Sequence, residues 1–252
     1  MAKTLFVGDL HGKPDLLPLI NRVVKREQID RMVILGDICD DWTLSNNGMA
    51  YWFQSFANWY ARREIETIPL LGNHDIPYFL SKGSSALKRI RDIAPGFRPG
   101  AHRKVHELMA DIPFELAWTD GEVIATHAGL TVGWEKQHEM QDKSIREIVS
   151  WMNGLMRRST QLGDLFMEIG KARGGDSANP SPLWADLSET GKDGDQHFTQ
   201  VVGHSPVDTV TRNGNIWYCD TFSTRQDGSS IGDWTLLVKD DKNGMYVTDM
   251  LG

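Results

Sequence analysis

Short apolar runs rich in β-branched residues recur along the 252-residue chain, and each is bounded by Gly, Asp or Asn. Runs of this length and composition are typical of β-strands buried in a sheet. The pattern therefore predicts a strand at each of these runs: TLFVGD, RMVILGD, TIPLLGN, EVIATHA, QVVGH, IWYCD and WTLLV.

Helical patterns lie between the early strands. Residues 14–27 begin with a proline and carry leucine, isoleucine and valine on one face, which is typical of an amphipathic helix. Residues 48–63 carry an aromatic stripe near helical spacing, which we interpret as core packing rather than a ligand site. Alternating strands and helices indicate an α/β fold. The later strands have fewer helices between them, so we expect a mixed sheet or a second sheet.

Residues 135–170 are charged, rich in methionine and free of chemical motifs, and we expect them to form a helical insertion over the sheet. Residues 174–182, GGDSANPSP, have the composition of a loop. The sequence shows no internal repeat and no clear domain boundary. It therefore predicts a single domain over residues 1–252.

Composition narrows the classes of protein. The chain is 40% hydrophobic and 24% charged, as in soluble globular proteins, and no apolar run approaches the roughly 20 residues that span a bilayer. No secretory signal is visible, and Cys39 and Cys219 suggest no disulfide framework, so we expect a cytoplasmic protein. A net charge of -7 argues against a nucleic-acid partner. The same charge is compatible with a pocket that holds cations.

Polar side chains gather where the predicted strands end. The first strand ends in GDLHG, the second in GDICDD, the third in GNHD, the fourth in THAG and the fifth in GHSP. Any one of these could be an ordinary turn. Five together indicate a site, because ligands bind beyond the carboxyl ends of strands in α/β sheets. The candidate ligands are Asp9, His11, Asp37, Asn73, His127 and His204.

These six side chains exceed the needs of one tetrahedral zinc ion. They suit two adjacent ions with one carboxylate bridging between them. Oxygen and imidazole donors fit manganese, iron or zinc, and the ligand types alone leave the choice open.

The ordered set of motifs resembles the calcineurin-like metallophosphoesterase superfamily, and more closely its phosphoprotein phosphatase branch with bacterial and phage relatives. The motifs span residues 8–206, most of the chain. The resemblance implies a sandwich of two packed mixed β-sheets flanked by helices. It also implies a role for each ligand: Asp9 and His11 would bind the first metal, Asp37 would bridge both, and Asn73, His127 and His204 would complete the second.

The same resemblance implies a route for the proton. His74 would protonate the leaving oxygen, and Asp40 would orient His74. The expected reaction is hydrolysis of a phosphate ester by a bridging water. A transition state with negative charge spread over oxygens suits such a cationic site.

Two departures from the branch affect the substrate. The last motif continues with Ser205 and Pro206, as in phosphoprotein phosphatases, and lacks the second histidine of nucleases and cyclic diesterases. The second motif, however, has Asp41 and Trp42 where that branch has a phosphate-binding arginine followed by glycine. We expect another arginine to reach the site. Arg173, before the PLW cluster, is the candidate, with Arg212 and Arg225 as alternatives.

Three functions remain open. The first is a metal-dependent phosphatase acting on phosphorylated proteins or small phosphate esters. The second is a dinucleoside polyphosphate hydrolase, which the GNHD motif and the absent arginine keep open. The third is a metal-holding scaffold without activity, which the complete ligand set disfavours. The sequence predicts no membrane partner and does not indicate an oligomeric state.

Overall fold

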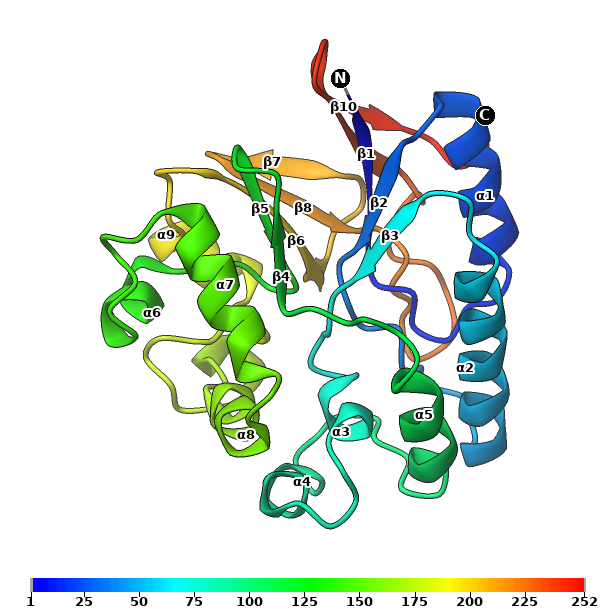
Figure 1. Ribbon diagram of the computed structural model, residues 1–252, viewed down its shortest axis with the longest axis vertical. Helices are drawn as coiled ribbons and strands as arrows, with labels where there is room; N and C mark the ends of the chain where they lie inside the picture. The colour runs from blue at the N-terminus through cyan, green and yellow to red at the C-terminus, as the bar shows by residue number, and fades with distance from the viewer. Residues whose placement is uncertain (1, 252) are drawn as a thin grey trace.

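The computed structural model describes residues 2–251. Two mixed β-sheets lie face to face, and helices cover their outer sides (Figure 1). This arrangement confirms the predicted fold. Each sheet has five strands within residues 2–251.

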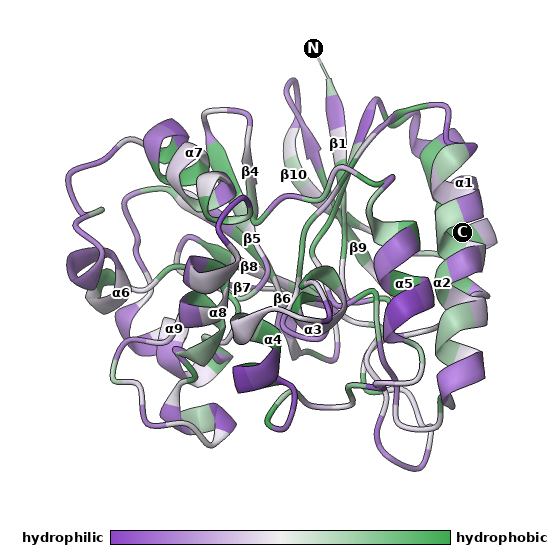
Figure 2. Ribbon diagram, turned by 60° about the horizontal axis from the view of Figure 1, so that its bottom comes forward, coloured by the Kyte–Doolittle hydropathy of each residue, from purple (hydrophilic) through white to green (hydrophobic). Residues whose placement is uncertain are grey.

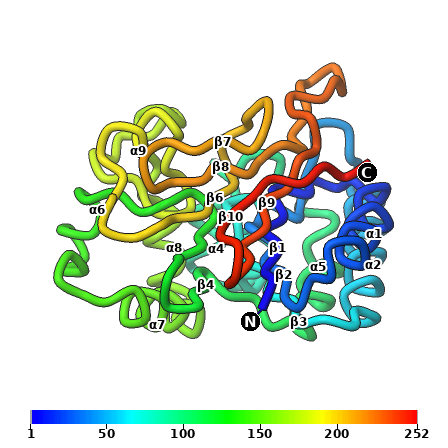
Figure 3. The backbone as a smooth tube through the Cα atoms, turned by 90° about the horizontal axis from the view of Figure 1, so that it is seen from above, coloured from blue at the N-terminus to red at the C-terminus, as the bar shows by residue number. Residues whose placement is uncertain are grey.

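The first sheet combines the N-terminal strands with the last two strands of the chain. Its order is β10 (Gly244–Thr248), β9 (Leu236–Asp240), β1 (Lys3–Val7), β2 (Arg31–Ile34) and β3 (Glu66–Pro69). Strands β1, β2 and β3 are parallel, whereas β9 runs antiparallel to both β1 and β10. Figure 3 shows the chain returning beside its own start, with β9 next to β1 and β10 on the far side of β9.

The second sheet has a parallel centre and antiparallel edges. Its order is β4 (Ala117–Thr119), β5 (Val123–Thr126), β6 (Thr199–Pro206), β8 (Ile216–Asp220) and β7 (Thr211–Asn213). Strands β5, β6 and β8 are parallel, and β4 and β7 pair antiparallel at the two edges. Both sheets therefore direct a set of parallel strand ends toward one side of the sandwich.

Most helices fall into two groups on opposite sides of the sandwich (Figure 1). The group nearer the first sheet is α1 (Leu16–Glu27), α2 (Asn46–Ala61), α3 (Ile76–Phe79) and α5 (His102–Met109). The group nearer the second sheet is α6 (Val132–Gln137), α7 (Ile145–Leu155), α8 (Ser159–Met167), the 3-10 turn η1 (Lys171–Arg173) and α9 (Leu187–Asp193). Helix α4 (Ser85–Ile90) lies between the two groups and packs against α8.

Alternation along the strands divides the core into two layers. On β1, Leu5 and Val7 pack with the side chains of α1 and α2, whereas Phe6 faces the second sheet and packs against Trp118. Successive side chains of a strand point to opposite faces, so a strand covered on both faces reads as a continuous apolar run. Figure 2 shows α1, α2 and α5 with both hydrophobic and hydrophilic bands, as expected for helices that cover a core.

The structure corrects several predicted boundaries. The first helix begins at Leu16 rather than at the proline at position 14, because residues 13–15 form a turn before it. Residues 135–170 are largely helical and contain parts of three helices, and the first of them begins at Val132, before the predicted start. Strands β4, β7 and β10 were not predicted, since each is short or exposed and lacks a buried apolar run.

No helix within residues 2–251 is both long and apolar enough to cross a membrane. The single-domain organisation stays a prediction.

Candidate metal centre

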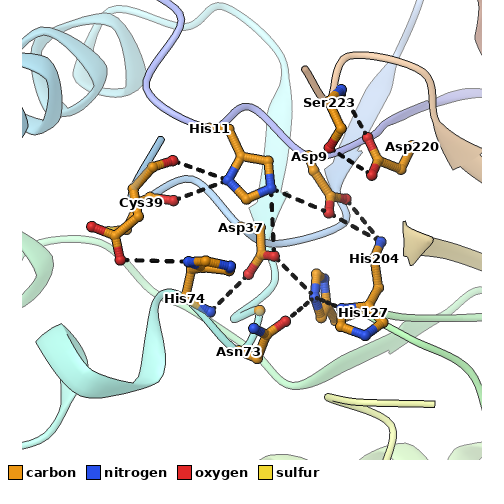
Figure 4. Close-up of polar contacts among 12 residues, drawn as sticks. Asp9, His11, Asp37, Cys39, Asn73, His74, His127, His204, Asp220 and Ser223 are labelled. Carbon is orange, nitrogen blue, oxygen red and sulfur yellow. Dashed lines mark hydrogen bonds and ion pairs between the residues drawn. The ribbon is translucent and has the colours of Figure 1, made fainter. Parts of the chain in front are cut away.

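The predicted ligands come from the carboxyl ends of parallel strands in both sheets. Asp9 and His11 follow β1, and Asp37 follows β2. Asn73 follows β3, whereas the second sheet contributes His127 after β5 and His204 near the end of β6. Because these strand ends meet at one edge of the sandwich, six side chains spread over almost 200 residues lie together (Figure 4).

Asp37 occupies the middle of the cluster. Its Oδ2 lies 3.4 Å from His127 Nε2 and 3.7 Å from His11 Nε2. Its Oδ1 accepts a hydrogen bond from the His74 backbone N–H at 2.9 Å. The carboxylate is almost fully buried, so its position is fixed by the structure around it.

Two groups of potential ligands share this carboxylate. One contains His11, Asp37 and His74, the other contains Asp37, His127 and His204, and the ligand atoms of each lie within 4.8 Å of one another. Asp9 borders the first group, with its Oδ2 3.9 Å from His11 Nε2. The geometry is that of two neighbouring cation sites joined by Asp37.

Backbone carbonyls orient the imidazoles. Nδ1 of His127 lies 2.8 Å from the Leu35 carbonyl oxygen, and Nδ1 of His11 lies 3.0 Å from that of Asp40. A carbonyl only accepts, so each Nδ1 carries a proton; in the neutral form of the ring, which is the form that binds a metal, the lone pair of Nε2 then faces the centre. Ligand histidines in metalloproteins are commonly oriented in this way.

Polar atoms of the second group converge on one ring nitrogen of His127. His127 Nε2 lies 3.0 Å from Asn73 Oδ1 and 3.1 Å from His204 Nδ1. Burial lowers the pKa of His204 well below its usual value, and the nearby Arg173 and His127 lower it further. A neutral His204 is the form that binds a metal.

Several buried carboxylates lie close together in the centre, and their negative charges favour binding of a cation. Burial raises the pKa of Asp9 well above its usual value, and the charges of Asp220 and Asp37 raise it further. Burial also opposes ionisation of Asp37, but His127 and His74 hold its pKa well below the usual value. Buried charges need compensation, and hard cations bound to these oxygen and nitrogen donors provide it. The donor set therefore fits two metal ions.

His74 and Asp40 stand beside this centre as a pair. His74 Nδ1 lies 3.5 Å from Asp40 Oδ2. Burial opposes a charge on His74, but Asp37 and then Asp40 raise its pKa to about 9. Asp40 is held by the Tyr78 hydroxyl, which donates to its Oδ1 at 2.7 Å, and by Arg98 Nη1 at 3.0 Å.

The backbone is strained where it presents these side chains. His11, Asp37, Asp40 and His204 have φ angles of 39°, 46°, 64° and 63°. This left-handed region costs non-glycine residues about 1–3 kcal/mol each. Such conformations persist where packing enforces them, and they gather at functional sites.

Two motif glycines make room for the ligands. A Cβ on Gly72 would collide with the Asp37 carboxylate and backbone, and one on Gly203 would collide with Asp9 Oδ1. The glycines of GNHD and GHSP therefore have a steric role as well as a turn role.

A cleft of about 460 Å³ opens over the centre, and Arg173 lines it together with His204. Nη2 of Arg173 donates to the His204 carbonyl oxygen at 3.1 Å and to Ser205 Oγ at 3.2 Å. Its Nε lies 3.0 Å from Asp186 Oδ2. Of the two alternative arginines, neither Arg212 nor Arg225 lines this cleft.

Sequence reasoning missed three residues that support the centre. Asp220 ends β8 at the same edge and accepts hydrogen bonds from the backbone and hydroxyl of Ser223; the strand-end rule applied to IWYCD identifies it. Asp75 accepts from the backbone N–H groups of Ile38, Cys39 and Gly72. Arg98 follows no strand, and no local pattern signals its contact with Asp40.

Comparison with known proteins agrees with this geometry. The family model described as calcineurin-like phosphoesterase matches residues 2–232. The chain belongs to this family of dinuclear metal-dependent phosphoesterases. Among curated proteins, no sequence is significantly similar to the chain.

Solved structures share the fold at low sequence identity. A cold-active protein-tyrosine phosphatase of a psychrophilic Shewanella species has a TM-score of 0.58 and 18% identity, covering 99% of this chain and 78% of its own. A protein serine/threonine phosphatase from Saccharomyces cerevisiae has a TM-score of 0.45 and 11% identity, covering 98% of this chain and 79% of its own.

Proposed function

We propose that this phosphoesterase hydrolyses phosphate monoesters at a centre of two metal ions. The observation that carries the proposal is the pair of ligand groups that share Asp37, with the His74–Asp40 pair beside them. Asp9, His11 and Asp37 would hold one ion, and Asp37, Asn73, His127 and His204 the other. Bound ions would neutralise phosphoryl oxygens and lower the pKa of water.

The protein's own groups then act on the substrate. Asp40, which faces the His74 ring, favours its protonated form, and His74 donates this proton to the leaving oxygen as a general acid. Asp40 orients the His74 ring and stabilises its charge. We assign His74 to this role rather than to a ligand role because its Nδ1 faces Asp40.

Arg173 is the proposed phosphate clamp. Its guanidinium lies at the cleft beside His204. Its Nε and Nη2 contact Asp186, His204 and Ser205, which leaves the N–H groups of Nη1 for phosphoryl oxygens. A monoester leaves more unbridged oxygens for such a cation than a diester does. Hydrolysis of a phosphate monoester is also the activity named for the Shewanella structure with this fold.

Activity assays separate the candidate functions. Purified protein is stripped with a chelator, reloaded with manganese, iron or zinc, and assayed with p-nitrophenyl phosphate, bis-p-nitrophenyl phosphate and diadenosine tetraphosphate. We expect metal-dependent turnover with the highest kcat/KM on the monoester.

Each of the other outcomes contradicts the proposal in its own way. A higher kcat/KM on diadenosine tetraphosphate establishes the dinucleoside polyphosphate hydrolase, and one on the diester establishes a phosphodiesterase. Stoichiometric metal binding without turnover of any phosphate ester indicates the scaffold. The proposal also includes manganese, iron or zinc as the metal, a phosphorylated protein or a small phosphate ester as the substrate, and a cytoplasmic location.

A further inference from the structure

One aromatic side chain at the mouth of the cleft has no role in the proposed chemistry. Trp42 is 63% exposed, and it is the only one of the nine tryptophans, all of which lie within residues 2–251, that is mostly exposed. The indole is nevertheless held in place, since its Nε1 donates to the Thr224 carbonyl oxygen at 2.9 Å. An exposed, fixed apolar ring presents a flat surface to whatever enters the cleft.

Trp42 lines the same cleft as His74, the proposed proton donor, and is close in sequence to Asp40, the residue that orients His74. It follows Asp40 by two residues, Asp40 faces His74, and all three line the same cleft. A leaving group that takes its proton from His74 departs on this side of the centre. The lining of the cleft also includes Pro95, Gly96 and Ile231, which carry no charge.

The charges along this wall disfavour an anionic leaving group. Asp41 lines the cleft beside Trp42. The Arg98 guanidinium, the nearby cation, donates to Asp40 Oδ1 and to the carbonyl oxygens of Asp41, Leu44 and Gly96. With its donors committed to the protein, Arg98 offers little to a second phosphate. Lys13, which interacts with the Asp41 charge, donates to the His11 carbonyl oxygen and does not line the cleft. A polyphosphate leaving group would therefore meet the Asp41 carboxylate without a cation that faces the cleft beside it.

We propose that the enzyme prefers phosphate monoesters of aromatic alcohols, and that Trp42 confers this preference by stacking on the ring of the leaving group. Offset or edge-to-face aromatic contacts stabilise such a pair beyond the area that they bury. The cleft volume of about 460 Å³ lies within the range of small-molecule sites. This inference rests on the proposed monoesterase function and adds the chemical class of its substrate.

The test compares one aromatic and one aliphatic ester in matched variants. For wild type, Trp42→Ala and Trp42→Phe, kcat/KM is measured on phenyl phosphate and on ethyl phosphate. Intrinsic reactivity of each leaving group cancels when a variant is divided by wild type on the same ester. Trp42→Ala should lower kcat/KM about 10-fold more on phenyl than on ethyl phosphate. Trp42→Phe should restore most of the difference.

Tyr51→Ala is the matched control. Tyr51 is 76% exposed on α2 and does not line the cleft, so its loss should leave the ratio of the two esters unchanged. Circular dichroism and metal content confirm that each variant is folded and loaded. Equal losses on both esters in Trp42→Ala, or no loss on phenyl phosphate, would overturn the assignment of Trp42.

A binding measurement separates this inference from the proposed function. Calorimetry gives the affinities of phenylphosphonate and methylphosphonate, which are not hydrolysed, for metal-loaded wild type and Trp42→Ala. We expect wild type to prefer phenylphosphonate and the variant to lose that preference. If wild type turns over no monoester, the proposed function fails, and this comparison still decides whether Trp42 selects aromatic ligands. Equal preference in both proteins rejects the role of Trp42.

Discussion

Two buried clusters of acidic side chains stand in contrast. In the metal centre, Asp9 and Asp37 face imidazoles whose protons are tied to backbone carbonyls, so lone pairs converge on one point. Between α6 and the segment after α9, Glu135 lies near Asp195 with its Oε1 buried and without a hydrogen-bond donor in the structure described. Within residues 2–251, neither Glu135 nor Asp195 belongs to a group of metal-compatible donors.

The two clusters offset the free-energy cost of burying acidic groups in different ways. Burial raises the pKa of Glu135 to about 8, with a further contribution from Asp195, so one proton removes most of the charge at neutral pH. The centre at Asp37 instead keeps its carboxylate ionised beside histidines and surrounds it with further donors. Burying an acid therefore does not by itself make a metal site; the convergence of lone pairs does.

Replacing a carboxylate by its amide should have opposite effects in the two clusters, and the largest effect is at Asp37. Asp37→Asn weakens the bridge between both ligand groups, so we expect loss of metal, loss of nearly all activity and a lower Tm. Elemental analysis, kinetics and thermal unfolding measure these. If Asp37→Asn stays active and retains two equivalents of metal, Asp37 is not a required metal ligand, and the proposed difference between Asp37 and Glu135 is wrong.

The next effect separates proton transfer from metal binding inside the centre. His74→Asn should retain both metals and lose roughly 10²–10⁴-fold in kcat. The loss should be smaller for p-nitrophenyl phosphate than for an alkyl phosphate, because a good leaving group needs less protonation. If metal content falls with activity, or the loss is the same for both esters, His74 belongs with the ligands instead.

A smaller loss is expected for the cation at the rim of the centre. Arg173→Ala should lower kcat/KM by roughly 10- to 1000-fold at unchanged metal content, as for removal of one charge-stabilising donor. Arg173→Lys should restore part of it, since a point charge bonds one oxygen at a time. The exposed Arg212→Ala serves as control. If Arg173→Ala leaves kcat/KM unchanged on every ester that the enzyme hydrolyses, Arg173 does not bind the phosphate.

The smallest effect concerns stability at Glu135. The pKa of Glu135 is raised in the folded protein. Its contribution to the free energy of unfolding is therefore fully present below the unfolded pKa of about 4.5 and is lost as the pH rises through the folded pKa of about 8. Glu135→Gln carries no charge to bury. Its Tm relative to wild type should therefore rise between pH 4.5 and 8 and level off above, with activity unchanged at pH 7. If the difference in Tm between Glu135→Gln and wild type does not change with pH, the pKa of Glu135 is not raised in the folded protein and the prediction is wrong.

The sequence predicted the α/β architecture, with the two-sheet sandwich implied by its resemblance to a known family, and it named the candidate ligands that the structure brings together. Strand-sized apolar runs that end in Gly-Asp or Gly-Asn-His predict parallel strands, and parallel strands place their carboxyl ends at one edge. That local rule identified the six candidate ligands and His74, and its consistent application identifies Asp220 as well. The same rule did not predict the short edge strands β4 and β7, because an edge strand of three residues has too few buried positions to produce a hydrophobic pattern.

Only the tertiary structure decided how these groups are held and what covers them. Arg98 reaches Asp40 across 58 residues, Trp42 is tied to Thr224 across 182, and Asp75 braces the loop that carries Asp37. Each is a single polar contact between loops, without a repeating pattern along the chain. Hydrophobic periodicity is a property of neighbouring residues and so can be read from sequence. A contact between distant loops depends on how the two sheets pack, and its partners are known only once the chain is folded.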